Sequence, residues 1–375
     1  MLVRELKLRL TKSQEAELNR WLPSLQSVYN FGLRKIELNA QDKIYFSRFD
    51  FQSLLKGHSK TLGIPSHCLQ GVLLQAYRAW ERCFKKTSGK PRLKSQRRPL
   101  RSIPFPDPIK PPKDSRVGIP GLGKVRYFKQ DLPEGKIKCG RVVQRASGWY
   151  LQLTIDAQHT FPVKECAPPV GIDTGFKALA TLSDGTTYVN PRELRLGALR
   201  LAQAQRGRNK KLAARLQERQ ANRRKDRNHK ISREIVENYS AIYVTNDNLR
   251  GQAKRFGKSI AEAGISQLRQ MLLYKGAVIG SRAVALVDSK NTTRTCSACG
   301  CLSGPTGLSG LSVRQWECTD CGGLHDRDVN AARNILFAGL GWSHESGSDT
   351  ASRNPRAAPR EHQMPISTDY RWHSL

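Results

Sequence analysis

The chain has 375 residues, and 64 Lys and Arg oppose 31 Asp and Glu, so the formal net charge is +33 at pH 7. An excess of this size creates a positive field that suits a polyanionic partner. Hydrophobic residues make up 38% of the sequence, which is enough for a buried core and excludes wholesale disorder. A membrane-spanning helix needs about 20 almost uninterrupted apolar residues. The best candidate, residues 271–287, is interrupted by charges, and the N-terminus lacks a signal peptide's apolar block, so we expect a cytoplasmic protein.

The N-terminal half alternates between strand and helix patterns. Residues 2–10 alternate apolar and charged side chains, which predicts a strand. Thr11 and Gln14 fit a capping box before an apolar helical stripe, and a second stripe runs from Leu69 to Phe84. After residue 85 the composition shifts to Pro, Ser and basic residues. Short strands follow, the clearest being 149–155, which predicts a small β-domain with basic loops.

The C-terminal half begins with three strand patterns separated by turns, from Pro168 to about Val189. A long polar helical pattern then covers residues 194–239. Two apolar strands, 241–244 and 282–288, flank a helix with Ile265, Leu268 and Leu272 on one face. The segment after Leu340 is polar and poor in apolar residues, so we expect a disordered tail over 341–375.

The long helical pattern is strongly basic. Fifteen Lys and Arg lie between Arg192 and Arg233 against three acidic residues, and these charges would repel one another without a polyanion. The alternative is a solvated charged face. We expect contacts with nucleic-acid phosphates, which give affinity without reading sequence. The residues that we assign to this role are Arg223, Arg224, Lys225 and Arg227.

Four cysteines form the strongest local motif. Cys296 and Cys299 make one CxxC pair, and Cys318 and Cys321 make a second after eighteen residues. Structural Zn²⁺ takes four tetrahedral ligands, and two such pairs supply four thiolates. A redox CxxC would need only one pair. The spacing therefore predicts a zinc ribbon, with His325 as a further nearby candidate ligand.

Two acidic motifs are candidates for a catalytic metal site. Asp173 lies in the middle of an apolar strand in Gly-Ile-Asp-Thr-Gly, where a carboxylate is costly unless it is paired or holds a cation. Asp328 follows the zinc motif and opens a helix. Two divalent ions roughly 3.5–4 Å apart need several carboxylates, and these two could converge. The alternatives are an Asx turn at Asp173 and helix capping by Asp326.

These features, in this order, resemble the TnpB family of RNA-guided nucleases, which insertion sequences encode and which are related to type V CRISPR effectors. The resemblance implies a guide RNA and a double-stranded DNA target read largely by base pairing. Further motifs that carry it are Leu10–Gln14, Val28–Asn30, Gly89–Lys94, Gly148–Tyr150, Leu272–Lys275 and Asp326–Ala332.

The resemblance also implies an α/β architecture with an RNase H-like (RuvC) nuclease domain, an inserted zinc ribbon, an N-terminal β-barrel wedge part and a helical recognition part. The implied boundaries are 1–10 and 86–165 for the wedge, 11–85 for recognition, 166–290 and 324–340 for the nuclease, and 291–323 for the ribbon.

Carried over residue by residue, Asp173 matches the first catalytic aspartate and Asp328 the last, with Mg²⁺ as the catalytic ion. Cys296, Cys299, Cys318 and Cys321 match the ligands of the structural Zn²⁺.

The middle catalytic position departs from the family pattern. Thr245 stands where the family usually has a glutamate, and threonine supplies no carboxylate. Our first candidate for a displaced acid is Glu262, and the second is Asp247.

Two classes of function follow: a guided Mg²⁺-dependent DNA endonuclease with a relocated acid, or a guided DNA-binding protein that no longer cuts. The retained Asp173 and Asp328 favour the endonuclease. A zinc-ribbon transposase or accessory protein is a poorer third reading.

Overall fold

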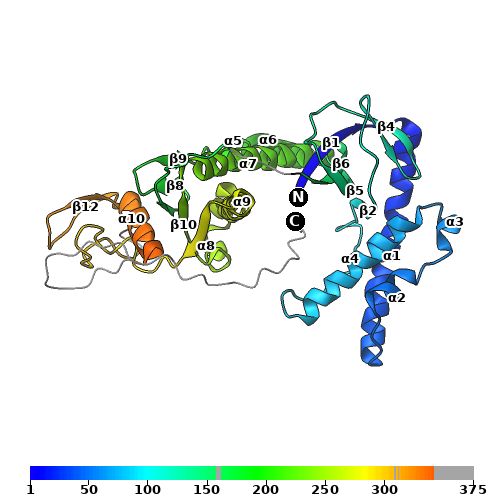
Figure 1. Cartoon of the computed structure of the whole chain (residues 1–375), viewed down its shortest axis with the longest axis horizontal. Helices are drawn as coiled ribbons and strands as arrows, with labels where there is room; N and C mark the ends of the chain where they lie inside the picture. The colour runs from blue at the N-terminus through cyan, green and yellow to red at the C-terminus, as the bar shows by residue number, and fades with distance from the viewer. Residues whose placement is uncertain (158–161, 308–309, 311, 342–375) are drawn as a thin grey trace. The chain divides into compact units, whose positions relative to one another are not determined.

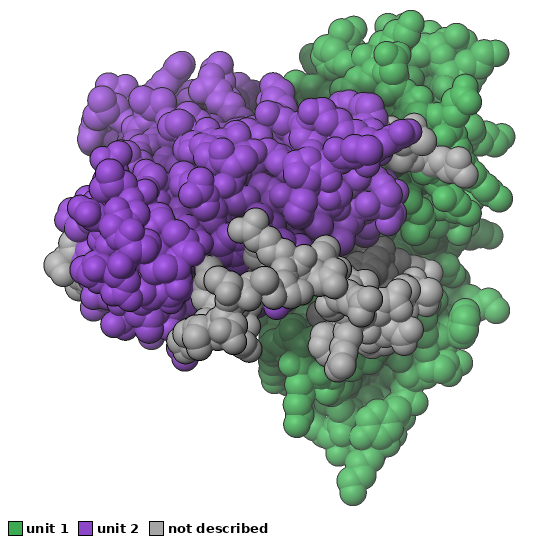
Figure 2. All heavy atoms as spheres, turned by 60° about the vertical axis from the view of Figure 1, so that its left-hand side comes forward, with its two compact units in different colours: residues 1–159 green, residues 160–375 purple. Residues whose placement is uncertain are grey.

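The structure is a computed structural model, and it describes residues 1–157, 162–307, 310 and 312–341 (Figure 1). The chain divides into two compact units, Met1–His159 and Thr160–Leu375, each with its own hydrophobic core (Figure 2). The predicted tail lies outside the described residues except for Gly341. Within the described part of the chain, every helix is too short or too polar to cross a membrane.

The first unit contains a six-stranded antiparallel sheet. Its strand order is β2-β5-β6-β1-β4-β3. The N-terminal strand and the hairpin around residue 149 are both confirmed, the latter with Val142 opposite Leu151. The strands are β1 (Leu2–Arg9), β2 (Ser102–Phe105), β3 (Arg116–Ile119), β4 (Gly123–Tyr127), β5 (Lys136–Arg145) and β6 (Gly148–Asp156).

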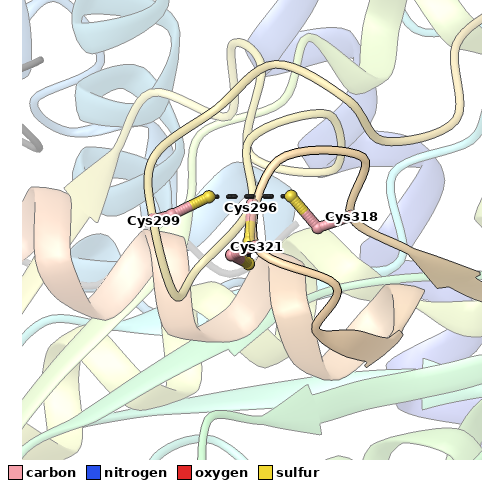
Figure 3. Close-up of side chains that lie close together, drawn as sticks. All are labelled: Cys296, Cys299, Cys318 and Cys321. Carbon is pink, nitrogen blue, oxygen red and sulfur yellow. Dashed lines mark hydrogen bonds between the residues drawn. The ribbon is translucent and has the colours of Figure 1, made fainter.

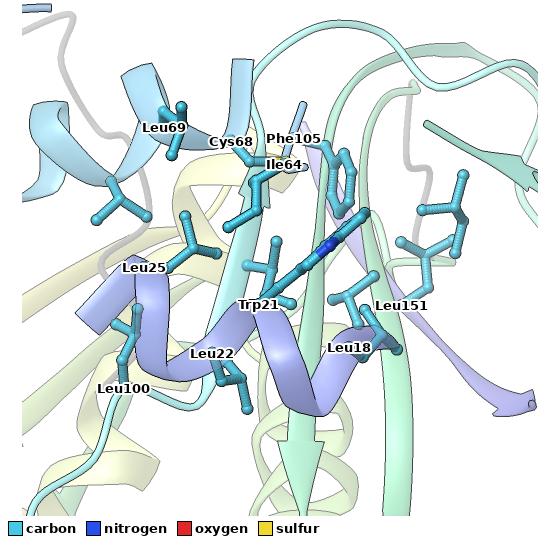
Figure 4. Packing of buried hydrophobic residues seen from close by; sticks show 14 of the residues in the cluster. Leu18, Trp21, Leu22, Leu25, Ile64, Cys68, Leu69, Leu100, Phe105 and Leu151 are labelled. Atoms are coloured by element: carbon cyan, nitrogen blue, oxygen red, sulfur yellow. The ribbon is translucent and has the colours of Figure 1, made fainter. Parts of the chain in front are cut away.

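Four helices pack with this sheet around one core. They are α1 (Lys12–Gln41), α2 (Arg48–Ser53), α3 (His58–Leu62) and α4 (Ser66–Phe84). The predicted capping box is present, since Thr11 and Gln14 exchange side-chain and backbone hydrogen bonds. Trp21 of α1 lies in the same apolar cluster as Phe105 and Leu151 of the sheet (Figure 4). The predicted wedge and recognition segments therefore share a single core.

The second unit is built on a mixed five-stranded sheet of order β11-β10-β7-β8-β9. The strands β7, β8 and β9 form an antiparallel meander, whereas β10 runs parallel to both β7 and β11. Val244 pairs with Ile172, so the next residues, Thr245 and Asp173, end the two parallel strands at one edge. The strands are β7 (Val170–Asp173), β8 (Ala178–Leu182), β9 (Thr187–Val189), β10 (Ala241–Thr245) and β11 (Ala283–Val287).

Helices flank this sheet, and a small hairpin precedes the last of them. The helices are α5 (Glu193–Leu196), α6 (Ala198–Arg206), α7 (Lys210–Asn238), α8 (Leu249–Ala263), α9 (Ile265–Ile279) and α10 (Arg327–Leu340), and the hairpin strands are β12 (Gln315–Glu317) and β13 (Leu324–Asp326).

The long basic helix expected over residues 194–239 is not continuous. Gly207 ends α6, and Arg208 has a left-handed backbone with φ of 52°. The Asn209 side chain then accepts a hydrogen bond from the Leu212 N–H at 3.0 Å and starts α7 afresh. The capping preference of Asn explains why a new helix begins here, which the charge pattern did not predict.

Helix α10 lies directly on β7, and a glycine makes this possible. A Cβ atom added at Gly171 would overlap the carbonyl oxygen of Ala332 and would lie 2.5 Å from the backbone nitrogen of Leu336. At the other end of α10, a Cβ at Gly339 would overlap the ring of Tyr243 in β10. Backbone atoms cannot move aside as a flexible side chain can, so Gly171 sets the distance between helix and strand.

We expect Gly171→Ala to destabilise the protein by about 1–3 kcal/mol or more, the range for overpacked cores. The matched control is Gly118→Ala in β3, where an added Cβ meets nothing within 4 Å. Thermal denaturation of the two variants should show a lower Tm for Gly171→Ala alone. Equal Tm values would mean that α10 shifts without cost.

Candidate functional site

Asp173 and Asp328 come together where the end of β7 meets the start of α10. Asp326 is the N-cap of α10 and accepts hydrogen bonds from the N–H groups of Asp328 and Val329, both at 3.0 Å. Helix capping is thus done by Asp326, which leaves the Asp328 carboxylate available. Desolvation by the surrounding protein, with Asp328 and Asp247 nearby, raises the pKa of Asp173 to about 7. The two sequence-predicted aspartates therefore belong to one electrostatic site.

The middle position of this site holds hydroxyls and an arginine. The Thr245 side chain is buried, and its Oγ1 lies 2.9 Å from Oγ1 of Thr174. The Arg269 guanidinium, from α9, donates to Thr245 Oγ1 at 3.3 Å and to the Asp247 carboxylate at 2.8 Å. A carboxylate and a buried cation thus occupy the region next to Asp173.

Arg269 is the site residue that sequence reasoning missed. Its side chain is only 9% exposed, and its Nε has no hydrogen-bond partner among the described residues. The signal was present, because Arg269 follows Ile265 by four residues and precedes Leu272 by three, on the same apolar face. A charge on such a face predicts a buried partner, which here is Asp247.

Glu262, the first candidate for the displaced acid, makes its contacts elsewhere. Its side chain is 4% exposed, accepts a hydrogen bond from the Arg195 N–H at 3.1 Å and pairs with the Arg195 side chain. Asp247 instead contributes to the raised pKa of Asp173. Of the two candidates, Asp247 is the one whose charge acts on Asp173, and the identity of the middle carboxylate stays a prediction.

Arg314 contacts the Asp328 carboxylate from the side of the cysteine-rich segment. Its Nη1 lies 3.2 Å from Oδ2 of Asp328, and its side chain is 45% exposed. Unlike Arg269, it has open solvent available. The site therefore combines one buried and one exposed guanidinium with its carboxylates.

The four predicted metal-binding cysteines converge (Figure 3). All four Sγ atoms lie within 4.8 Å of one another, with Cys296 and Cys321 at 3.8 Å and Cys299 and Cys318 at 3.6 Å. A tetrahedral ion with metal–sulfur bonds of about 2.3 Å places its thiolates roughly 3.8 Å apart, so the geometry fits a metal.

His325 lies beside this cluster, with its Nε2 at 3.0 Å from the Cys296 sulfur. It packs on the Trp316 ring. His325 therefore fits the role of a hydrogen-bond partner that orients the Cys296 sulfur, because the four cysteines already provide four tetrahedral ligands.

The cysteine cluster is connected to α10 by two buried asparagines. Asn330 accepts a hydrogen bond from the Ser297 N–H at 2.8 Å and donates to the Thr295 carbonyl at 2.8 Å. Asn334 donates to the carbonyl of Thr292 at 2.8 Å. The Asn-Ala-Ala-Arg-Asn sequence thus joins the first metal-binding loop to the helix that carries Asp328.

The four basic residues assigned to nucleic acid differ in their surroundings. Arg227 is 13% exposed, pairs with Glu193 and donates to the Ala263 carbonyl, so it fastens α7 to its neighbours. Arg224 donates to the Ala261 carbonyl at 2.7 Å. Arg223 and Lys225 are exposed. Nucleic-acid contact stays a prediction, and the exposed pair is best placed for it.

The raised pKa of Asp173 predicts a pH-dependent stability when divalent cations are absent. An unfolded aspartate has a pKa of about 3.9. Between about pH 4 and 7 the folded chain therefore keeps a proton that the unfolded chain has lost, and stability falls as pH rises through this window. Asp173→Asn should be more stable than wild type above pH 7 and lose that advantage near pH 4, as Tm measured against pH would show.

Asp226→Asn is the control for that measurement, because Asp226 is exposed and forms an ion pair with Lys230, which is also exposed. It should keep the wild-type pH dependence of Tm. Parallel curves for wild type and Asp173→Asn would contradict the assigned pKa.

The chain is similar to known proteins over most of its length. The family described as "Probable transposase" matches residues 152–255, and the "Cas12f1-like, TNB domain" family matches residues 266–335. A protein named as an RNA-guided DNA endonuclease from Streptomyces pristinaespiralis is 31% identical over 89% of this chain and 88% of its own. InsQ from Escherichia coli K12, with the same designation, is 28% identical over 88% and 90%.

Among solved structures, the fold is similar to a Cas12f1 chain from a cryo-EM complex with sgRNA and target DNA. The TM-score is 0.56 with 14% identity, over 88% of this chain and 83% of that one. Mimivirus TnpB-like protein L79 also matches, with 32% identity over 32% of this chain and 23% of its own. With the Streptomyces relative above 30% identity over nearly its whole length, the chain belongs to the TnpB family of RNA-guided DNA endonucleases.

Proposed function

We propose that this chain binds a guide RNA, uses it to bind matching double-stranded DNA, and hydrolyses the DNA backbone at Asp173 and Asp328. The guided binding is supported by the names of its relatives and by the net charge of +33. Hydrolysis is carried by one observation: the fold brings Asp173 and Asp328 into one electrostatic site from distant parts of the sequence.

We further infer that the second unit contains a RuvC-type, RNase H-like nuclease domain. The support is its strand order, in which an antiparallel meander is followed by two parallel strands on the other side of β7. The nuclease would comprise 166–290 and 324–340 with a zinc ribbon at 291–323. A wedge (1–10 and 86–165) and a recognition part (11–85) would form the first unit.

The carboxylates and Arg269 fit one divalent cation better than two. Asp173, Asp328 and Asp247 carry three negative charges when ionised. Opposing them are the buried Arg269, the exposed Arg314 on Asp328, and Arg327, whose charge lowers the pKa of Asp173. Two divalent ions would add four positive charges to a site that already holds these guanidiniums, whereas one Mg²⁺ leaves a smaller excess. Asp173 and Asp328 would hold this ion, which supplies Lewis-acid stabilisation and an activated water when bound.

Three side chains near the carboxylates would have separate roles in binding the DNA. Arg269 is fixed by Asp247 and Thr245, so its positive charge is already oriented toward the site before any substrate arrives. Arg314, being exposed, can leave Asp328 and bind a DNA phosphate. Thr245 would hold Arg269 in place through its hydroxyl.

The second candidate function is guided DNA binding without cleavage. The specific observation in its favour is that Thr245 and Arg269 stand where the family resemblance implies a carboxylate and a cation site. In that case Arg269 would neutralise Asp247, and target occupancy would be the whole activity.

The experiment that separates the candidates uses the chain copurified with its RNA and a matched DNA duplex. We expect cleavage in Mg²⁺, and Asp173→Asn or Asp328→Asn should each reduce it at least 100-fold, since each removes a charge that holds the ion. Guided binding in gel-shift assays should remain. A wild-type complex that binds but never cuts in Mg²⁺ or Mn²⁺ would leave the occupancy candidate.

Variants at residues 245 and 269 can be tested without cleavage, by counting the Mn²⁺ ions that the site binds. Wild type should bind one Mn²⁺ at this site, as counted by electron paramagnetic resonance after subtraction of the Asp173→Asn signal. Thr245→Glu combined with Arg269→Gln should bind two, because it exchanges a fixed cation for a carboxylate. Two Mn²⁺ ions in wild type would contradict the role given to Arg269.

We also propose that the cysteine cluster holds Zn²⁺, the ion that prefers four tetrahedral thiolates. Cys318→Ser should release about one Zn²⁺ per chain, measured by elemental analysis, and lower Tm because metal binding supplies folding energy. Cys166→Ser, at an exposed cysteine outside the cluster, should do neither. Wild-type protein without zinc would disprove the assignment.

A further inference from the structure

Three arginines stand in one row across neighbouring strands of the first unit. Arg9 of β1 is paired directly with Arg126 of β4, and Arg126 is paired with Arg116 of β3. All three are exposed on the outer face, and none forms an ion pair with a described carboxylate. Like charges directly opposite each other destabilise a sheet. Such a row becomes favourable once an anion lies across it.

The row borders a pocket of about 460 Å³. Phe128, which follows β4, lies in the same pocket and is 41% exposed, although a ring of this size is usually covered. The Arg9 guanidinium lies 3.9 Å from the centroid of the Phe128 ring. The Lys7 ammonium also lies over this ring, 5.6 Å from its centroid. Two cations thus cover part of the ring, and the exposed remainder offers an aromatic surface beside the arginine row.

Two residues that line the pocket have a strained backbone. Asp114 and Ser115 both have left-handed backbones, with φ of 50° and 57°. Neither is glycine, and two such residues in succession cost free energy. The Ser115 carbonyl accepts a hydrogen bond from the Tyr127 N–H at 3.0 Å, which holds the turn against β4. This conformation keeps an acceptor carboxylate and a hydroxyl at the edge of an otherwise basic pocket.

We propose that this pocket binds one unpaired ribonucleotide of the guide RNA. The arginine row would bind the phosphates on either side of it, and the base would stack on Phe128, as bases stack on aromatic side chains in single-strand binding sites. The Asp114 carboxylate repels phosphate, so it would accept a hydrogen bond from the ribose 2′-OH, a group that DNA lacks.

The chemistry of the pocket favours an unpaired nucleotide over a duplex as its occupant. A volume of about 460 Å³ lies in the range of small-ligand sites, and stacking on Phe128 requires a base that is free of its pairing partner. The proposal rests on the proposed function only for the source of the nucleotide. The pocket itself is formed by the paired strands, the Phe128 ring and the turn at Asp114 and Ser115, whatever the source of the nucleotide.

The first test maps contacts in the assembled complex. The chain copurified with its RNA is irradiated at 254 nm, digested and analysed by mass spectrometry. We expect a nucleotide attached to the peptide that contains Phe128. Loss of this adduct in Phe128→Leu, with Tm unchanged, would support the pocket. Adducts on other peptides only would overturn it while leaving guided binding intact. If no RNA copurifies or rebinds, the proposed function fails instead.

The second test uses fluorescent hexauridylate and hexathymidylate with the RNA-free full chain in 0.3 M salt. Stacking of a base is worth about 1–3 kcal/mol, so Phe128→Leu should weaken hexauridylate binding roughly 5- to 150-fold. The matched control is Phe49→Leu, since Phe49 is 79% exposed in α2 and does not line the pocket. Equal losses in both variants would overturn the stacking role.

Two further variants separate phosphate binding from sugar recognition. Arg126→Gln should reduce the slope of log K against log salt by up to about 0.7 for one lost phosphate contact in a single strand. Asp114→Gly removes the acceptor and tolerates the left-handed backbone, so it should reduce the preference for hexauridylate over hexathymidylate. Equal affinity of the wild-type chain for the two oligonucleotides would overturn the assignment to a ribonucleotide.

Discussion

The candidate nuclease site depends on the close approach of α10 to β7 at Gly171. Asp173 lies two residues after this glycine, and Asp328 lies in the first turn of the helix that packs on it. The separation of the two carboxylates is therefore fixed by backbone contact and not by flexible side chains. Sites that must hold an ion within tenths of an ångström benefit from such rigid supports. The glycine of the Gly-Ile-Asp motif is thus as much a part of the site as the aspartate.

The cysteine cluster extends the same construction to the start of α10. Asn330 and Asn334 connect that helix to the loop around Cys296, so a metal bound there also fixes the helix that carries Asp328. Arg314, from the segment between the two CxxC pairs, contacts Asp328 directly. The cysteine-rich segment is therefore connected directly to the helix that carries Asp328. This gives a physical reason for the order of motifs, in which the second CxxC pair immediately precedes the last aspartate.

Sequence patterns predicted the elements better than their contacts. The strands, the capping box at Thr11 and the convergence of four cysteines follow from periodicity and ligand spacing, which are local properties. The break at Gly207 and the burial of Arg227 and Arg269 were not predicted, because charge counts do not say which arginines face the interior. The choice between Glu262 and Asp247 stays a prediction, because it depends on how α8 and α9 fold relative to β10, which is not a local property of the sequence.

The middle of the site shows how one substitution constrains another. With a carboxylate at residue 245, a buried guanidinium at residue 269 would form an ion pair there and compete with any cation. With Thr245, the guanidinium instead donates to a neutral hydroxyl and keeps its charge for Asp247. Removing Arg269 alone would leave Asp247 buried without its partner, which is costly. Thr245, Arg269 and Asp247 therefore act as a unit, and only a change at both residue 245 and residue 269 can return the site to a carboxylate-rich form.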